Sequence, residues 1–405
     1  MSLVGVATIL TIAFLLSTSR RLVKRRTVAV ALALQALVAA LVFYVPYGSE
    51  VLDRIVTGVQ YIINYANDGI ELVIGQNVKQ NLGFTIAFND LPVIVFIGAL
   101  MGVLYHLGIM QRFVGVFGGW LHKLLKTSQS ESVSAVSNIF VGHTDAPLVI
   151  KPYLKDMTES ELFAVMTGGC ATIAGAVMMG YAAMGVDLKY LITASFMAAP
   201  GGLLMAKILM PETTTSDVEF DPTHTGDGDQ PVNVFEAIGN GAMTGMQVAF
   251  SVGAMLVAFV ALIALINGVL SGVGAWFGVE DLTLQWLLGK AFAPLAFLIG
   301  VPWSEAAEAG SLIGQKLVIN EFYAYVSFVG VKETLSAHTQ LVVTFALCGF
   351  ANLSSIAILL GGLGAVVPER RSDIARLGLR AVIGGTLANL MNASLAGLFF
   401  ALQAV

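Results

Sequence analysis

The sequence predicts an all-α polytopic membrane protein, and three observations support this fold class. Hydrophobic residues make up 57% of the 405 residues and charged residues only 12%, about half of the charged fraction that soluble domains carry. Eight segments are long and apolar enough to cross a bilayer. Two further apolar segments are interrupted by polar residues and proline, which is typical of re-entrant helical hairpins.

The eight predicted spans are apolar runs with few or no charged side chains, because about 20 such residues are needed to cross roughly 30 Å of hydrocarbon. They cover residues 3–19, 27–49, 91–111, 162–186, 190–206, 237–279, 334–367 and 381–405. The first run is not a signal peptide, because its basic residues follow the apolar stretch instead of preceding it.

Basic loops predict the orientation of the chain. Residues 20–26 form a short loop with five Lys and Arg side chains, and such loops stay in the cytoplasm. With eight spans, both termini then lie outside, and a second basic loop over residues 370–380 also falls inside. The acidic segment 211–231 falls inside as well, and its Asp, Glu, Thr, Gly and Pro content predicts a solvated cytoplasmic linker between two halves.

Helix interruptions are the most informative part of the sequence. We expect a re-entrant hairpin over about 127–155, interrupted from Asn138 to Pro147, and another over about 291–320, interrupted from Pro302 to Glu305. Each arm is too short to cross the membrane alone. The seventh span, about 334–367, is predicted to be a helix broken at residues 348–355.

The layout of these segments predicts an internal repeat. Each half has one hairpin, the first beside an uninterrupted span at 162–186 and the second beside the broken helix, as in many secondary transporters. The predicted regions are 1–90 with the N-terminal spans and an interfacial segment, 91–210 with the first hairpin, the linker 211–231, 232–290 with a long scaffold span, and 291–405 with the second hairpin, the broken helix and the last span.

Ionisable residues at membrane depth cost about 3 kcal/mol each, so they are candidates for function. His143, Thr144 and Asp145 lie at the predicted tip of the first hairpin, where unwound backbone allows neighbouring side chains to converge on one ligand. Alternatively, Asp145 caps the helix that begins near Pro147. Glu321 lies where the second hairpin meets the seventh span, and its alternative is a carboxylate at the membrane interface.

Polar residues in the broken segments extend this list. Asn352 and Ser355 share one side of the seventh span next to Phe350, which suits a ligand with a flat ring and hydroxyl groups, or else ordinary bonding between helices. Asn138 and Thr172 supply hard oxygen atoms that suit a small alkali cation, or else polar packing between helices.

Several classes of function are excluded. No basic stripe could neutralise a run of phosphates, so nucleic acid is not expected as a partner. Cys170 and Cys348 lie in apolar stretches, which excludes a disulfide framework or a zinc cluster. The sequence contains no HExxH, GxSxG or Walker motif, and a membrane hydrolase using His143 and Asp145 would lack a nucleophile. We therefore expect a transporter and not an enzyme.

At the level of motifs, the chain resembles the bacterial concentrative nucleoside transporters over essentially its whole length. The resemblance is carried by residues 138–148, 161–166, 173–175, 196–202, 300–303, 320–322 and 348–355. It implies eight transmembrane helices, two re-entrant hairpins, interfacial helices and a homotrimer in the bacterial inner membrane. It also implies sodium-coupled nucleoside import, with a transport domain of inverted repeats that moves like an elevator against a trimerisation scaffold.

The resemblance also implies roles for individual residues. The ribose-binding positions of the family match Glu321, Asn352 and Ser355, and Phe350 matches a phenylalanine near the nucleoside. The sodium ligands match Asn138, the carbonyls of Val141 and Ile173, and Thr172 in place of a serine.

The nucleobase positions differ from those of better-known members, which have Gln-Thr-Glu where this chain has His143, Thr144 and Asp145. The sequence therefore leaves open whether the substrate is a purine nucleoside, a modified nucleoside or a nucleobase. It also leaves open whether a proton replaces sodium, because a histidine can titrate near neutral pH.

Overall fold

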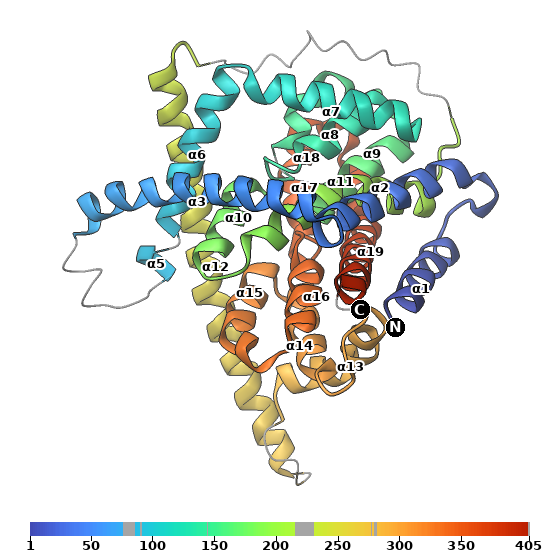
Figure 1. The fold of residues 1–405 in the computed structure, drawn as a ribbon, viewed down its shortest axis with the longest axis vertical. Coiled ribbons are helices and arrows are strands. Elements are labelled where there is room, and N and C mark those ends of the chain that lie inside the picture. Colours follow the sequence, from blue (N-terminus) through green and yellow to red (C-terminus); the bar gives the residue numbers. More distant parts are fainter. Residues whose placement is uncertain are drawn as a thin grey trace.

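The computed structural model describes residues 1–75, 86–89, 91–143, 145–214, 231–276, 278 and 282–403. Within these ranges the chain is helical and contains no strand (Figure 1), which confirms the predicted all-α fold class. Thr144 and most of the acidic segment 211–231 lie outside the described residues.

The helices of the first half end at the acidic segment. They are α1 (Ser2–Leu15), η1 (Arg20–Leu22), α2 (Arg25–Phe43), α3 (Pro46–Ile74), α5 (Ile86–Asn89), α6 (Leu91–His106), α7 (Ile109–Leu125), α8 (Gln129–Ser137), η2 (Ala146–Tyr153), α9 (Glu159–Ala171), α10 (Gly175–Ala183) and α11 (Leu188–Leu209).

The helices of the second half follow that segment. They are α12 (Val234–Trp276), α13 (Leu284–Leu298), α14 (Ala306–Val318), α15 (Glu321–Val331), η3 (Lys332–Thr334), α16 (Ala337–Leu347), α17 (Ser354–Gly361), α18 (Leu363–Val366), η4 (Pro368–Arg370) and α19 (Arg371–Gln403).

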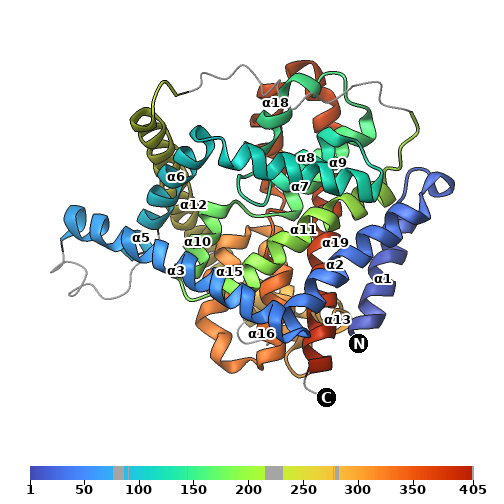
Figure 2. The same ribbon diagram turned by 45° about the horizontal axis from the view of Figure 1, so that its top comes forward.

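Helix length and composition agree with a multi-pass membrane protein. In the described part of the chain, six helical segments are long and apolar enough to cross a bilayer: Arg25–Phe43, Ile86–His106, Glu159–Ala183, Leu188–Leu209, Val234–Trp276 and Pro368–Gln403. The other two predicted spans coincide with the shorter apolar helix α1 and with the interrupted pair α16 and α17. Helix α3 runs across the direction of α12 in two views (Figures 1 and 2), as an interfacial helix would.

The two halves repeat one order of elements. A long helix (α6 or α12) is followed by a helix beside the hairpin (α7 or α13), the hairpin itself (α8 and η2, or α14 and α15), a broken helix (α9 and α10, or α16 and α17) and a long final helix (α11 or α19). Helices α7 and α8 lie at the top of Figure 1, and α13 and α14 lie at the bottom. The two hairpins therefore enter the molecule from opposite ends.

The fourth span differs from its prediction, because it is interrupted. Helix α9 ends at Ala171, Thr172 has an extended backbone (φ −110°, ψ 168°), and α10 begins at Gly175. The interrupting residues Thr172, Ile173 and Ala174 include neither proline nor a charged side chain. A break made of such residues does not stand out from an apolar run, so the sequence predicted a continuous helix.

The second hairpin also differs in register from the prediction. The turn at Pro302 to Glu305 lies at the surface, where Trp303 is 63% exposed and the Glu305 carboxylate accepts a 2.9 Å hydrogen bond from Ser336 Oγ. The turn that faces the interior lies between α14 and α15, at Ile319 and Asn320, which are both buried. Proline and tryptophan therefore indicated a real turn, but one at the protein surface.

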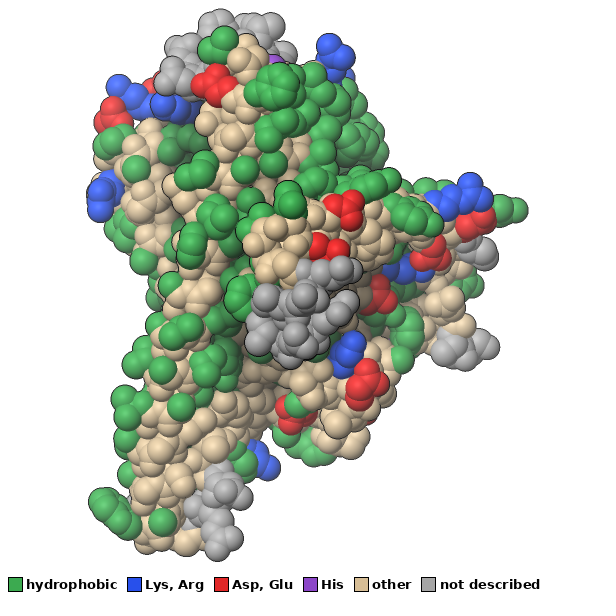
Figure 3. All heavy atoms as spheres, turned by 90° about the vertical axis from the view of Figure 1, so that its left-hand side faces the viewer, with side chains coloured by type: hydrophobic (Ala, Val, Ile, Leu, Met, Phe, Trp, Pro, Cys, Tyr) green, Lys and Arg blue, Asp and Glu red, His purple; other side chains and the backbone are tan. Residues whose placement is uncertain are grey.

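Helices α6 and α12 pack closely through glycines. A Cβ atom on Gly241 of α12 would lie 2.4 Å from the carbonyl oxygen of Gly98 on α6, and one on Gly98 would lie 2.6 Å from the carbonyl oxygen of Gly241. Small residues allow helix backbones to approach in membranes, where van der Waals contact drives association. Much of the remaining surface of α12 is exposed and apolar, and Figure 3 shows hydrophobic side chains along it.

The glycine contact predicts a stability difference between two neighbouring positions on α12. Gly241→Ala should lower the stability of the fold by about 1–3 kcal/mol, because the added methyl group forces α6 and α12 apart. Gly239→Ala is the matched control, since a Cβ atom added there would have no atom of the described residues within 4 Å, and alanine favours a helix over glycine by about 1 kcal/mol. Thermal unfolding in detergent measures both, and equal midpoints for the two variants would contradict the packing argument.

Candidate functional site

The two broken helices meet inside the molecule. The backbone N–H of Phe350, in the break between α16 and α17, donates a 3.1 Å hydrogen bond to the carbonyl oxygen of Thr172, in the break between α9 and α10. The hairpins join the same region, because Gly175 N–H donates to the Phe140 carbonyl at 2.9 Å and Leu353 N–H donates to the Leu317 carbonyl at 3.1 Å. Backbone groups freed by the breaks thus bind one another across the repeat.

Three predicted residues of the second half form one polar cluster. Asn352 Nδ2 donates a 2.9 Å hydrogen bond to Glu321 Oε2, and Ser355 Oγ lies 3.0 Å from Asn352 Oδ1. All three side chains are buried, and Glu321 is only 6% exposed. Protein therefore encloses Glu321 in this structure, which argues against an exposed carboxylate at the membrane interface.

The tip of the first hairpin places an imidazole beside Phe350, in the same helix break as Asn352. The ring of His143 lies 4.8 Å from the ring of Phe350, at an angle of 61°. His143 is buried, and among the residues that the structure describes neither ring nitrogen has a hydrogen-bond partner. A neutral imidazole offers one donor and one acceptor. The hairpin tip packs closely on α9, and this packing requires Gly169, because a Cβ atom at that position would lie 2.7 Å from His143 Cβ.

Asp145 follows at the same tip. It occupies the position before η2 but makes no side-chain capping bond to that helix, and it is exposed. The structure therefore gives no support to the capping alternative for Asp145.

The predicted cation ligands also lie at the first break. Asn138 is buried at the end of α8, where its Nδ2 donates to the Ser134 carbonyl at 3.0 Å and its Oδ1 has no partner in the described part of the chain. Thr172 Oγ1 donates to the Gly168 carbonyl at 3.0 Å, so its lone pairs stay available. Ile173 is buried and Val141 is half-buried.

The donor atoms at this break suit a hard cation. Among the described residues, no group of three or more His, Cys, Asp or Glu side chains could hold a metal ion. The candidate ligands near α9 are instead neutral amide and hydroxyl oxygens. Such a set fits an alkali cation better than a transition metal.

Sequence reasoning missed three residues that the structure adds. The Tyr181 hydroxyl donates a 3.1 Å hydrogen bond to Glu321 Oε1. Lys316 and Asn389 are buried beside the breaks and hydrogen bond to each other at 2.7 Å. A lysine and an asparagine inside apolar helices are detectable signals, but Tyr181 gives none, because tyrosine is common in such helices.

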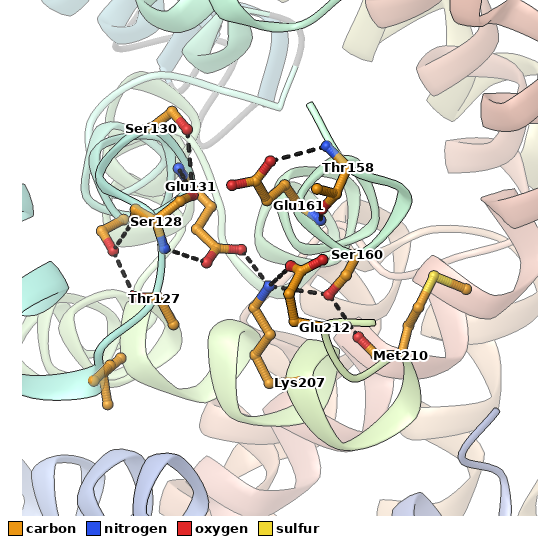
Figure 4. A network of polar contacts seen from close by, with 12 residues as sticks. Thr127, Ser128, Ser130, Glu131, Thr158, Ser160, Glu161, Lys207, Met210 and Glu212 are labelled. Carbon is orange, nitrogen blue, oxygen red and sulfur yellow. Dashed lines mark hydrogen bonds and ion pairs between the residues drawn. The ribbon is translucent and has the colours of Figure 1, made fainter. Parts of the chain in front are cut away.

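An ion-pair network holds the base of the first hairpin (Figure 4). Glu131 closes a capping box with Ser128 at the start of α8, and its Oε2 lies 2.7 Å from Lys207 Nζ on α11. Lys207 also lies 3.3 Å from Glu212 Oε2 and donates a 3.0 Å hydrogen bond to Ser160 Oγ. The network joins the first hairpin to α9, to α11 and to the residues that lead out of α11.

Comparisons with known proteins cover the whole chain. Family models described as "Na+ dependent nucleoside transporter N-terminus", "Nucleoside recognition" and "Na+ dependent nucleoside transporter C-terminus" match residues 4–77, 87–187 and 190–397 in that order.

Curated relatives agree with the family models. The chain is 54% identical to an uncharacterized transporter of Haemophilus influenzae, and 48% identical to the nucleoside permease NupC of Helicobacter pylori; each match covers 100% of this chain and 98% of the relative. It is 36% identical to sodium/nucleoside cotransporter 2 of Rattus norvegicus, with 98% of this chain and 62% of the rat protein covered.

Solved structures extend the similarity to three dimensions. A structure of CNTnw in an inward-facing substrate-bound state matches with a TM-score of 0.95 at 53% identity, covering 100% of this chain and 98% of that chain. A variant of CNTnw in an intermediate state matches with a TM-score of 0.97 at 53% identity, covering 99% of each chain. These matches confirm the fold over the full length.

The network at the base of the first hairpin predicts an order of stability losses. Lys207→Met should destabilise the fold by about 3–5 kcal/mol, because it leaves the Glu131 carboxylate buried without a partner. Glu212→Gln should cost about 1 kcal/mol or less, since this partner is more exposed. In thermal unfolding, the double variant Lys207→Met/Glu131→Gln should recover part of the loss. No recovery in the double variant would show that the ion pair is not the cause.

Proposed function

The chain belongs to the Na+-dependent nucleoside transporter family, and from this we propose that it is a cation-coupled symporter that imports nucleosides across the bacterial inner membrane. The observation that carries the proposal is the buried cluster of Glu321, Asn352 and Ser355 at a helix break. Its relatives are permeases and cotransporters, and the chain is a transporter and not an enzyme.

In the proposed complex, the polar cluster binds the ribose. A sugar that leaves water needs a partner for each hydroxyl, and unpaired hydroxyls cost about 1–3 kcal/mol each. Glu321 accepts hydrogen bonds, and Asn352 and Ser355 both donate and accept them. Tyr181 fixes the other carboxylate oxygen of Glu321, so that Glu321 is oriented before the sugar arrives.

The nucleobase then lies between the first hairpin and the α16/α17 break. Phe350 offers an aromatic face, and His143 offers an unpaired donor and acceptor next to it. Thr144 and Asp145 complete the proposed tip. Because an imidazole replaces the amide of better-known members, preference for purine or modified nucleosides is the alternative within this proposal.

Sodium is the proposed coupling ion, held by Asn138, Thr172 and the carbonyls of Val141 and Ile173. The unpartnered Oδ1 of Asn138 supports this. Coupling would run through the hydrogen bond between the Thr172 carbonyl and the Phe350 N–H, since a cation that orders the first break also orders the nucleoside site. Each ligand then raises the affinity for the other by the same factor.

Transport is proposed to proceed by an elevator movement within a homotrimer. The hairpins, the broken helices, α11 and α19 would form the moving domain, and α6 and α12 would form part of the scaffold. Helices α9 to α11 are largely buried, whereas most of the apolar part of α12 is exposed. Helix α12 therefore has the surface for contacts with lipid or another subunit. The basic loop at residues 20–26 supports a cytoplasmic position for that loop and both termini outside.

Uptake into proteoliposomes tests substrate and ion together. We expect labelled uridine, adenosine or guanosine to accumulate under a sodium gradient, with at least a tenfold loss, about 1.4 kcal/mol or more, in Glu321→Gln, because a hydrogen bond to a charged group contributes about 1.5–3 kcal/mol. Accumulation under a proton gradient alone would show that the coupling ion is a proton instead of sodium. The unpartnered ring of His143 is the candidate group to carry that proton. Normal sodium-dependent uptake by Glu321→Gln would overturn the ribose assignment.

Two tyrosines separate a role in binding from one in folding. Tyr181 and Tyr325 are both fully buried, but the Tyr325 hydroxyl donates to the Thr344 carbonyl at 2.8 Å instead of to Glu321. Each Tyr→Phe change should cost about 1 kcal/mol of stability. Only Tyr181→Phe should also weaken nucleoside binding, by about fivefold. Equal binding by Tyr181→Phe and Tyr325→Phe would show that Tyr181 does not orient Glu321 for the ligand.

A further inference from the structure

A buried ammonium group lies next to the second break. Lys316, in the last turn of α14, is 1% exposed. Its Nζ donates hydrogen bonds of 2.7 Å to the Ala346 carbonyl and of 2.7 Å to Asn389 Oδ1. Among the described residues no carboxylate forms an ion pair with it, so neutral oxygen atoms surround the charge.

Asn389 connects Lys316 to the other broken helix, α9/α10. Its Nδ2 donates to the Ala171 carbonyl at 2.6 Å and to the Cys348 carbonyl at 2.8 Å. Ala171 is the last residue of α9, and Ala346 and Cys348 lie at the end of α16. Lys316 and Asn389 together therefore bind freed carbonyl groups at the C-terminal ends of both broken helices.

Gly349 allows Asn389 to approach the ends of both broken helices, because glycine has no side chain. A Cβ atom at this position would lie 2.3 Å from Asn389 Oδ1 and 2.8 Å from the Ala171 carbonyl oxygen. Glycine is thus required where the two helix ends and the Asn389 amide come together.

Carbonyl groups at a helix C-terminus carry partial negative charge, and at breaks in membrane helices they are the usual ligands of a coupling cation. The ammonium of Lys316 has surroundings of this kind: a backbone carbonyl, an amide oxygen and two helix C-termini. It differs from a diffusible cation in being tethered to the hairpin.

Lys316 occupies a place in the second repeat that corresponds to the place of Asn138 in the first. Asn138, with its unpartnered Oδ1, ends the first helix of the first hairpin beside the α9/α10 break, and Lys316 ends the first helix of the second hairpin beside the α16/α17 break. We propose that Lys316 is a built-in cation of the second repeat, a positioning residue that holds the α16/α17 break in the form that binds the nucleoside. This inference rests on the proposed function, because it assigns to Lys316 the part that sodium is proposed to play in the first repeat.

The charge of Lys316 would also affect the ionisation of Glu321. Lys316 and Glu321 lie on either side of the short turn between α14 and α15. An ionised carboxylate buried without nearby positive charge is costly, and a tethered ammonium reduces that cost whether or not sodium is bound. Glu321 would then stay ionised throughout the transport cycle, while sodium regulates only the first break.

Binding of labelled uridine and adenosine to the purified full-length chain, with sodium present, tests the proposal. Lys316→Met keeps much of the side-chain length but removes the charge. It should weaken nucleoside binding by about tenfold to a hundredfold, the range seen when residues that orient the ligands of a metal ion are removed. Lys290→Met is the matched control, since Lys290 is an exposed lysine over the Trp286 ring on α13. It should bind like the native chain.

A second variant distinguishes a missing cation from a damaged fold. Lys316→Ala should recover several-fold in nucleoside affinity, and gain thermal stability in membranes, when n-propylammonium is added, but not when tetramethylammonium is added at equal concentration. The response of Lys316→Ala decides the question even if Lys316→Met does not fold. Native binding by Lys316→Met, or no response of Lys316→Ala to n-propylammonium in either measurement, would overturn the proposal. Failure of the native chain to bind either nucleoside would instead contradict the proposed function.

Discussion

The structure depends on one constraint: backbone groups that leave a helix at membrane depth must find partners inside the protein. Two broken helices and two hairpin tips release such groups in one place. The Phe350 N–H meets the Thr172 carbonyl there, and Asn389 binds the carbonyls of Ala171 and Cys348. Lys316 Nζ binds the Ala346 carbonyl at the end of the second broken helix. These contacts keep irregular backbone stable in an apolar chain and fix the side chains that project from it.

The same contacts give the proposed site a way to respond to two ligands. The first break carries the candidate cation ligands Asn138 and Thr172, and the second carries Phe350, Asn352 and Ser355. Because a backbone hydrogen bond joins the breaks, neither can change shape without affecting the other. The chain belongs to the nucleoside transporter family, and the proposed symport requires substrate and ion to be bound together before the carrier moves.

Much of this arrangement could be predicted from the sequence, because polar residues in apolar segments are conspicuous. Asn352 and Ser355 were predicted as a pair, the family resemblance grouped them with Glu321, and the three side chains form one cluster. The α9/α10 break could not be predicted from Thr172, Ile173 and Ala174, which look like ordinary apolar helix. The second hairpin was misplaced because Pro302 and Trp303 give a strong turn signal at the surface, whereas the inner turn at Ile319 and Asn320 has no proline or glycine. The roles of Lys316 and Asn389 depend on contacts between residues far apart in the chain, which no local pattern reveals.

The central claim is that the nucleoside binds where the two broken helices meet. A cryo-electron microscopy structure of the full chain in lipid, with sodium and a bound nucleoside, tests it most directly. The account predicts ribose density in contact with Glu321, Asn352 and Ser355, and base density between His143 and Phe350. Nucleoside density elsewhere, for example in the polar region around Lys207 and Glu131, with the Glu321 cluster unchanged and unliganded, would contradict it.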